Sequence, residues 1–119
     1  MKIVASLAAA LLAAGCASTP SPNEPMAVAR KGVERAAGTP EVAQWAPGEL
    51  ETARAKIAMA ESAMQRKDYD LARRYADEAE ADARLAEARA GARKNDAAVR
   101  DVNEALRGLR EEIARRPAG

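Results

Sequence analysis

Histidine and phenylalanine are absent from this 119-residue chain, and cysteine occurs once. The lack of histidine removes the commonest general base and metal ligand, and a single cysteine cannot form a disulfide within the chain. The chain therefore has no Ser/His or Cys/His nucleophile pair and no zinc site of thiolate and imidazole ligands. A glycine-rich phosphate-binding loop is also missing. These absences predict a protein that is not an enzyme and has no catalytic residue, no metal site and no cofactor.

An excess of charge of either sign is also missing, because 19 basic residues stand against 18 acidic ones. This balance predicts no nucleic-acid partner. Aromatic residues are limited to Trp45, Tyr69 and Tyr75, whereas alanine occurs 32 times. A chain rich in alanine, glutamate and arginine favours long helices over sheets. We therefore expect an all-α protein with a shallow core, because each alanine buries little apolar area.

The first fifteen residues have the pattern of a secretory signal peptide, in which a short basic start precedes an apolar stretch. Lys2 is followed by an apolar run over residues 3–14, and the small residue Gly15 comes next. As a helix this run measures about 18 Å, which is too short for a bilayer core of roughly 30 Å. We interpret residues 1–15 as a cleaved signal and not as a transmembrane anchor.

Cys16 directly follows the small residues Ala13, Ala14 and Gly15, which is the arrangement of a bacterial lipobox. Cleavage between Gly15 and Cys16 leaves the cysteine as the new N-terminus, where the thiol takes a diacylglycerol. Two or three acyl chains, such as palmitate, on one residue give stable membrane anchoring. The alternative interpretation is a buried structural cysteine in an N-terminal helix.

The residue after the cysteine is Ala17, whereas an aspartate there retains lipoproteins in the inner membrane of enteric bacteria. By resemblance to that sorting rule, the sequence predicts an outer-membrane lipoprotein that faces the periplasm. Residues 16–24 consist of the lipidated cysteine followed by prolines and small, mostly polar residues. This composition predicts a semi-extended tether.

Residues 25–116 are predicted to form one α-helical domain, an antiparallel hairpin or small bundle with a long, coiled-coil-like C-terminal helix. Prolines, a glycine and capping residues divide this domain. The expected elements are a helix from the N-cap Asn23 to about Ala37, a helical turn over 39–46, a helix from Pro47 to a break at 66–68, and a long helix from the N-cap Asp68 to Arg115.

The long helix carries two apolar stripes. The first consists of alanines that let another helix approach closely, namely Ala72, Ala76, Ala79, Ala83, Ala86 and Ala90. The second repeats every seven residues, as in a coiled coil, and contains Leu85, Ala92, Val99, Leu106 and Ile113 together with Ala88, Val102 and Leu109. Asn95 falls on this second stripe, where a polar residue often sets the register. We expect a kink, or a break into a fourth helix, near Gly91.

The C-terminal part of the second stripe has no obvious partner in the chain, because the preceding helix covers only the first half of the long one. Exposed apolar stripes of this kind are typical of binding surfaces. Either the first helix and the tether fold along the stripe, or a second chain does, as a protein partner or as a homo-oligomer. The predicted interaction seam consists of Val99, Val102, Leu106, Leu109 and Ile113.

Two further groups of residues have a functional and a structural interpretation. The acidic cluster of Asp77, Glu78, Glu80 and Asp82 could hold a hard cation, but nearby arginines favour a solvated helix face. The three aromatic residues could stack on a cell-wall sugar, but a role as core fillers at the turn before the long helix is favoured.

Two segments carry a family resemblance. Residues 65–72 resemble the turn and second-helix start of a tetratricopeptide repeat, although such repeats normally occur in arrays. A wider pattern includes Ala46-Pro47, Glu49-Leu50, Asp68-Tyr69 and Ala72-Arg73. Over roughly residues 25–114 the chain is similar to the small alanine-rich bacterial lipoproteins of the family called domain of unknown function 4398. The resemblance implies a helical envelope lipoprotein and no activity; some relatives join this region to a peptidoglycan-binding domain.

These observations predict a non-catalytic, periplasm-facing lipoprotein that is a structural or protein-interaction component of the bacterial cell envelope. Its expected partners are the membrane, through the lipid on Cys16, and a protein or a second copy, through the C-terminal helix. The alternative is a lipid-tethered binding module for peptidoglycan or a periplasmic protein, built on a tetratricopeptide-like hairpin.

Overall fold

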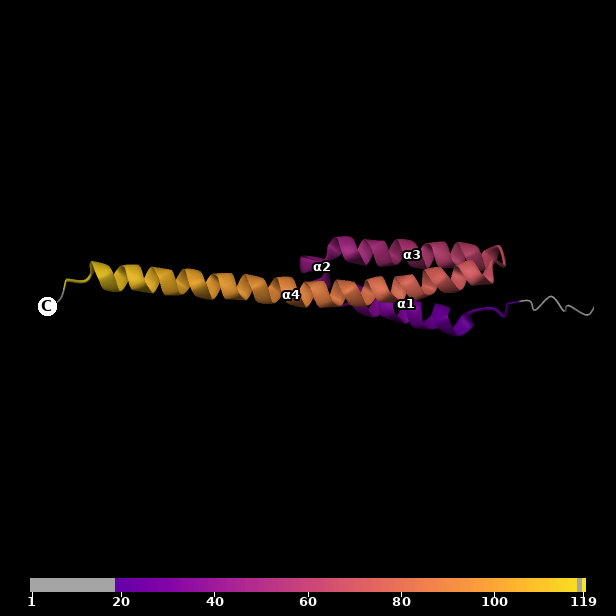
Figure 1. The fold of residues 1–119 in the computed structure, drawn as a ribbon, viewed down its shortest axis with the longest axis horizontal. Coiled ribbons are helices and arrows are strands. Elements are labelled where there is room, and N and C mark those ends of the chain that lie inside the picture. The colour runs from indigo at the N-terminus through magenta and orange to yellow at the C-terminus, as the bar shows by residue number, and fades with distance from the viewer. Residues whose placement is uncertain (1–18, 118) are drawn as a thin grey trace, which may run out of the picture.

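Four helices make up the fold. The computed structural model describes residues 19–117 and 119, and in that part of the chain it contains no β-strand. The helices α1 and α3 lie along the first half of α4, with α3 antiparallel to it, and the second half of α4 extends alone (Figure 1). The predicted all-α bundle with a long C-terminal helix is confirmed. The helix bounds are α1 (Asn23–Ala37), α2 (Pro40–Trp45), α3 (Pro47–Gln65) and α4 (Tyr69–Arg115).

The turn between α3 and α4 makes these two helices antiparallel. Lys67 adopts a left-handed conformation with φ 58°, and its N–H donates to the Met64 carbonyl at 3.0 Å. Asp68 then caps α4, because its side chain accepts a hydrogen bond from the Leu71 N–H at 3.3 Å. The predicted N-cap is confirmed, and the cap satisfies one of the amide groups that the first turn of a helix leaves unpaired.

The start of α1 differs from the prediction. Asn23 is the first helical residue and not the N-cap, which is Pro22. The Pro22 side chain is fully buried, and its carbonyl accepts from the Met26 N–H at 3.0 Å. Pro25 fits in the first turn because amide groups there need no helical partner. The last residues of the predicted tether therefore belong to the bundle, and Thr19 also donates to Asp70 at 3.3 Å.

Alanine forms most of the core. The six alanines of the first predicted stripe on α4, from Ala72 to Ala90, are each at most 1% exposed. A Cβ built on Gly32 of α1 would lie 4.0 Å from the Cβ of Ala83, so small residues on both helices allow a close approach. The residues that α1 and α3 bury in the core include Met26, Ala29, Val33, Ala36, Leu50, Ala53 and Ala60.

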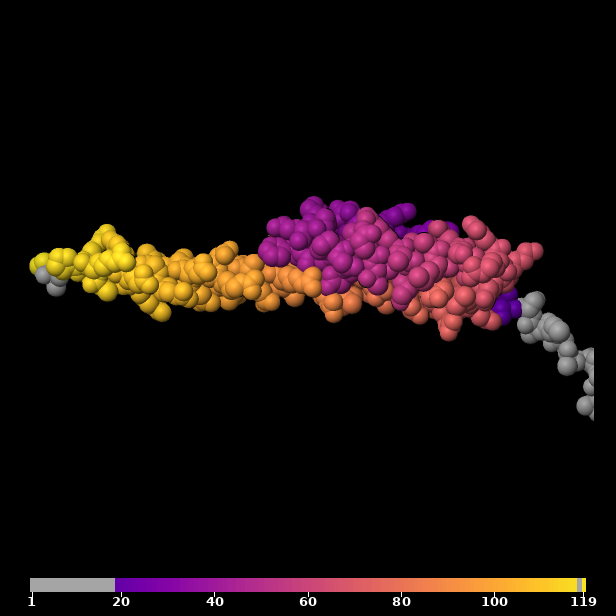
Figure 2. Space-filling view, turned by 90° about the horizontal axis from the view of Figure 1, so that it is seen from above, coloured from indigo at the N-terminus to yellow at the C-terminus, as the bar shows by residue number. Residues whose placement is uncertain are grey.

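The bundle ends where the alanine stripe ends. With 3.6 residues per turn, Lys94, Ala97, Asp101, Glu104 and Gly108 continue the face of Ala90, and those beyond Ala97 supply no apolar side chain for a neighbouring helix to cover. Every residue from Ala98 to Arg115 is exposed. We call residues 95–115 the free segment; it measures roughly 30 Å and projects beyond the other helices (Figure 2).

One prediction about α4 is wrong, and one of two open alternatives is excluded. The helix is one 47-residue element that runs through Gly91 without the expected kink or break (Figure 1). An interior glycine costs about 1 kcal/mol, and ion pairs to Arg89 and Arg93 hold α4 on either side of it. The first helix does not fold along the predicted seam either, because α1 packs on the alanine face near Ala83.

We predict that Ala83→Leu lowers the free energy of unfolding by about 1–3 kcal/mol, because extra methylene groups overpack a closely packed core. The matched control is Ala81→Leu, which places the same side chain at an exposed position of the same helix. The control should change the free energy by no more than about 0.5 kcal/mol. Urea unfolding followed by circular dichroism measures both values, and equal losses would contradict the alanine core.

Candidate interaction surface

The five residues of the predicted seam lie together on the free segment. Val99, Val102 and Leu109 are each 59–60% exposed, Leu106 is 44% exposed and Ile113 is 71% exposed. These are large values for apolar side chains on one helix face, and no described part of the chain covers them. The structure thus brings the predicted seam residues together on one surface and leaves that surface open.

The seam faces away from the alanine stripe. Successive residues of a helix are about 100° apart, which places all five seam residues roughly 100–180° around α4 from Ala90. The same outer face continues toward the bundle through Ala92, Ala88 and Leu85, and Leu85 is itself 40% exposed. The helices α1 and α3 therefore leave the whole seam accessible, because they occupy the opposite side of α4.

A group of ion pairs holds the base of the free segment. The Glu49 carboxylate of α3 accepts from Arg89 and from Arg93, each at 2.8 Å. Arg93 also donates to the Trp45 carbonyl at the end of α2. The Glu49 side chain is only 13% exposed, so these bonds are partly shielded from water. They attach α2 and α3 to α4 immediately before the segment leaves the bundle.

This group changes the titration of its carboxylates. The hydrogen bonds from Arg89 and then Arg93 lower the pKa of Glu49 to about 2. A hydrogen bond from Lys94 likewise lowers the pKa of Glu41, and Lys94 Nζ lies 2.9 Å from Glu41 Oε1. Both carboxylates are therefore charged at neutral pH. This group was not predicted from the sequence, although Arg89 and Arg93, two basic residues four apart on one helix, were a signal for it.

The acidic cluster on α4 forms ion pairs. Lys56 of α3 pairs with Glu78 and lies 3.6 Å from Asp82, and the hydrogen bond to Glu78 raises the pKa of Lys56. Glu80 pairs with Arg84 at 2.5 Å. Among the described residues no group of three or more potential ligands is placed to hold a metal ion. Glu78 and Asp82 of the cluster therefore face α3, and Glu80 pairs within α4.

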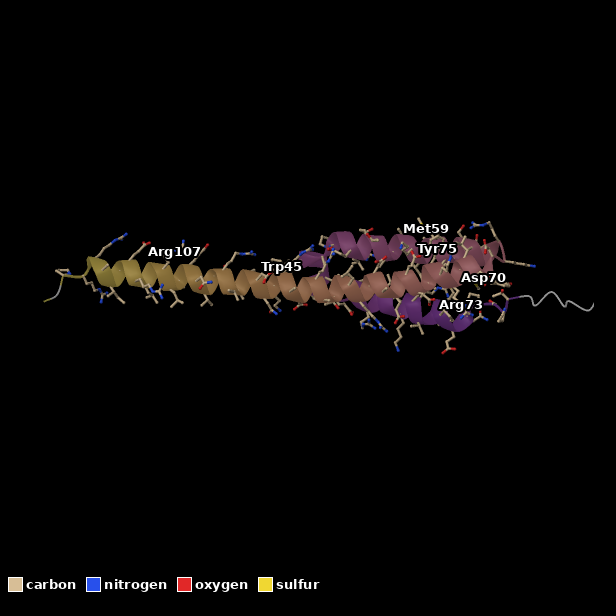
Figure 3. All side chains as sticks on the ribbon, in the orientation of Figure 1. Trp45, Met59, Asp70, Arg73, Tyr75 and Arg107 are labelled. Carbon is tan, nitrogen blue, oxygen red and sulfur yellow. The ribbon has the colours of Figure 1, made fainter. Side chains whose placement is uncertain are left out.

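The aromatic residues do not gather into one platform. Trp45 and Tyr75 are half-buried and pack against the core, but they lie at different ends of the bundle (Figure 3). Their contact with the core agrees with the core-filler interpretation. The predicted place was wrong for Trp45, which lies at the end of α2 and not at the turn before α4.

An open hollow of about 380 Å³ lies beside the start of α1, and its lining includes Asn23, Val28, Arg73 and Asp77.

The predicted lipidation and cleavage residues, Cys16 and Gly15, lie outside the described residues. In the described part of the chain, each helix is too short or too polar to cross a bilayer.

Comparison with known proteins identifies one family. The family model described as Domain of unknown function (DUF4398) matches residues 24–102, which is more than half of the chain. No curated protein and no solved structure matches the chain. The matched residues contain nearly the whole bundle and the start of the free segment, including Val99 and Val102 of the seam.

We predict that Glu49→Gln lowers the melting temperature at neutral pH and that this effect depends on pH. The folded pKa of Glu49, about 2, lies below the ordinary carboxyl value of 4.5. The stabilisation by Glu49 is therefore fully present above pH 4.5 and is lost as the pH falls toward 2. Thermal melts should show the two proteins converging over that range.

The matched control for this experiment is Glu51→Gln on the same helix. The Glu51 side chain is 67% exposed, and among the described residues it pairs only with Arg54, three residues away. Because exposed pairs contribute little, this variant should melt near the wild type at every pH. A pH-independent effect of Glu49→Gln would contradict the assigned role of its ion pairs.

Proposed function

This chain belongs to the family Domain of unknown function (DUF4398), and we propose that it is a non-catalytic lipoprotein of the bacterial cell envelope. In this proposal the lipid on Cys16 anchors the chain to the outer membrane on its periplasmic face. The free segment of α4 is the surface through which the chain binds other proteins. The family description assigns no activity, so the proposal is built from the residues of this chain.

The exposed seam is the observation that carries the proposed binding role. Full burial of one valine, leucine or isoleucine side chain is worth about 1.5–3 kcal/mol relative to exposure. Five such residues on one face of a single helix provide a strong driving force for covering that face. Monomeric soluble proteins rarely leave a continuous apolar stripe in contact with water.

The arrangement of the two ends supports the proposed anchoring. The described chain begins beside the start of α4, where Thr19 donates to Asp70, and the free segment lies at the other end of the molecule (Figure 1). A lipid at Cys16 would therefore attach the end remote from the seam. The length of α4, about 70 Å, would then allow the seam to reach well away from the membrane surface.

The charged residues of the bundle support a non-catalytic role. Catalytic acids and bases commonly have pKa values shifted toward neutral pH. Here the pKa values of the Glu41 and Glu49 carboxyl groups are lowered, because both groups form ion pairs between helices. These groups therefore stabilise the packing of the bundle, and they stay charged at neutral pH.

The first test concerns the anchor. We predict that bacteria expressing the full chain incorporate labelled palmitate into it, and that Cys16→Ala abolishes the label, because the thiol is the proposed acylation site. Ser18→Ala is the matched control and should keep the label. Label retained in Cys16→Ala, or absent from the wild type, would refute the lipoprotein assignment.

The second test concerns the seam. A photo-crosslinking amino acid placed at Leu106 in cells should give a discrete protein adduct after irradiation, because Leu106 is in the seam. The matched control places the same amino acid at Asp101, on the opposite side of the free segment, where we expect no adduct. The absence of an adduct from Leu106, or equal adducts from both positions, would refute protein binding through the seam. If the chain then sediments together with purified cell-wall sacculi, that result favours the peptidoglycan-binding alternative.

A further inference from the structure

We infer that the partner of the free segment is a second copy of this chain, and that the two segments pair antiparallel about a centre near residue 104. The inference rests on the proposed function in one respect, because it takes the seam to be a protein-binding surface. It adds the identity of the partner and the direction of the pairing.

The distribution of large side chains favours a partner with this symmetry. Four of the five seam residues, from Val99 to Leu109, are arranged symmetrically about residue 104. In an antiparallel pair about this centre, Val99 lies opposite Leu109 of the second copy, and Val102 lies opposite its Leu106. Each large residue of this stretch therefore meets another large one, as core packing of paired helices requires.

The distribution of charge selects the antiparallel direction. Residues 95–104 contain three carboxylates and one arginine, whereas residues 105–116 contain four arginines and two carboxylates. Antiparallel pairing places the acidic half of each segment beside the basic half of the other, and a parallel pair places like beside like. The helix macrodipoles also favour the antiparallel arrangement.

One ion pair follows directly from this register. Asp96 and Arg110 border the seam on the same side, and antiparallel pairing brings Asp96 of each copy next to Arg110 of the other. Within the described residues, neither side chain forms an ion pair in its own chain, in contrast to Glu111 and Glu112, which pair with the arginines four residues later. The same two positions do not meet in a parallel pair.

The bundle leaves room for the second helix. The helices α1, α2 and α3 lie on the alanine face of α4, and their ion pairs with α4 end at Lys94. The overlap of two free segments therefore begins beyond the bundle of either chain. Asn95 faces Ile113 of the second copy at each end of the overlap, where its amide can remain in contact with water.

Charge reversal tests the register in the full chain. We use Cys16→Ser protein in a mild detergent and measure the dimer dissociation constant by sedimentation equilibrium. Arg110→Glu should raise this constant about tenfold, because it places a carboxylate beside Asp96 of the other copy. The double variant Asp96→Arg/Arg110→Glu should restore the wild-type value to within about threefold, since it rebuilds the pair with reversed charges. Failure of the double variant to restore association would overturn the register.

Cysteine cross-linking tests the direction. In the same Cys16→Ser background, a mixture of Val99→Cys and Leu109→Cys chains should oxidise to a mixed disulfide at least ten times more than either variant alone. A disulfide between two Val99→Cys chains would show a parallel pair and overturn the inference. All these positions are exposed in the free segment, so the substitutions leave the bundle core unchanged.

One further control separates the seam from the rest of the chain. Leu106→Glu should abolish association, whereas equal association of this variant and the wild type would locate the contact elsewhere and overturn the inference. A chain that stays monomeric up to its solubility limit would also overturn it. If the chain is monomeric but photo-crosslinking at Leu106 in cells gives an adduct to a different protein, the proposed function still stands. If photo-crosslinking gives no adduct at all, both proposals are refuted.

Discussion

The close packing of α1 and α3 on the alanine stripe of α4 is the contact on which the rest of the structure depends. Because alanine has a single methyl group, helices can approach closely, and small residues such as Gly32 and Ala83 face each other. The same small size limits the apolar area that each contact removes from water. Helix propensity adds to this modest core, since alanine is the best helix former. The extent of the bundle follows from the extent of the stripe, which ends at Ala90.

Ion pairs between helices complement the alanine core. Lys56 with Glu78, Arg35 with Glu87, and Arg30 with Glu61 join α3 or α1 to their neighbours. Most of these pairs are exposed, and exposed pairs contribute little individually. Glu49 is different, because it is mostly shielded and accepts from two arginines. Its ion pairs with Arg89 and Arg93 attach α3 to α4 just before the free segment, at the point where α4 loses its neighbours. A rigid bundle and a projecting helix are thus joined without a flexible linker.

Periodicity accounts for the parts of the fold that the sequence analysis predicted. The alanine stripe of α4 was predictable because spacings of three and four residues reproduce the turn of a helix. The cap at Asp68 and the prolines at the starts of α2 and α3 were readable because their chemistry is local. The errors have a common origin in contacts between elements. Gly91 was expected to break α4, but its cost is offset by arginines that bind a residue 40 or more positions away. Pro22 was assigned to a tether, and only packing against the bundle shows that it is part of the fold.

The sequence by itself determined that the chain is helical, that α4 carries two apolar stripes, and that large side chains repeat every seven residues toward the C-terminus. These are properties of residue order, and the geometry of a single helix is enough to derive them. Only the tertiary structure decided where the first helix packs, because α1 lies on the alanine face near Ala83 and not along the seam. The helices α1 and α3 both pack on the alanine face, because small side chains there permit close approach along five turns, and neither helix extends along the free segment of α4. The seam is therefore exposed for a reason that lies in the packing of other helices, and its five side chains remain the open surface of the molecule.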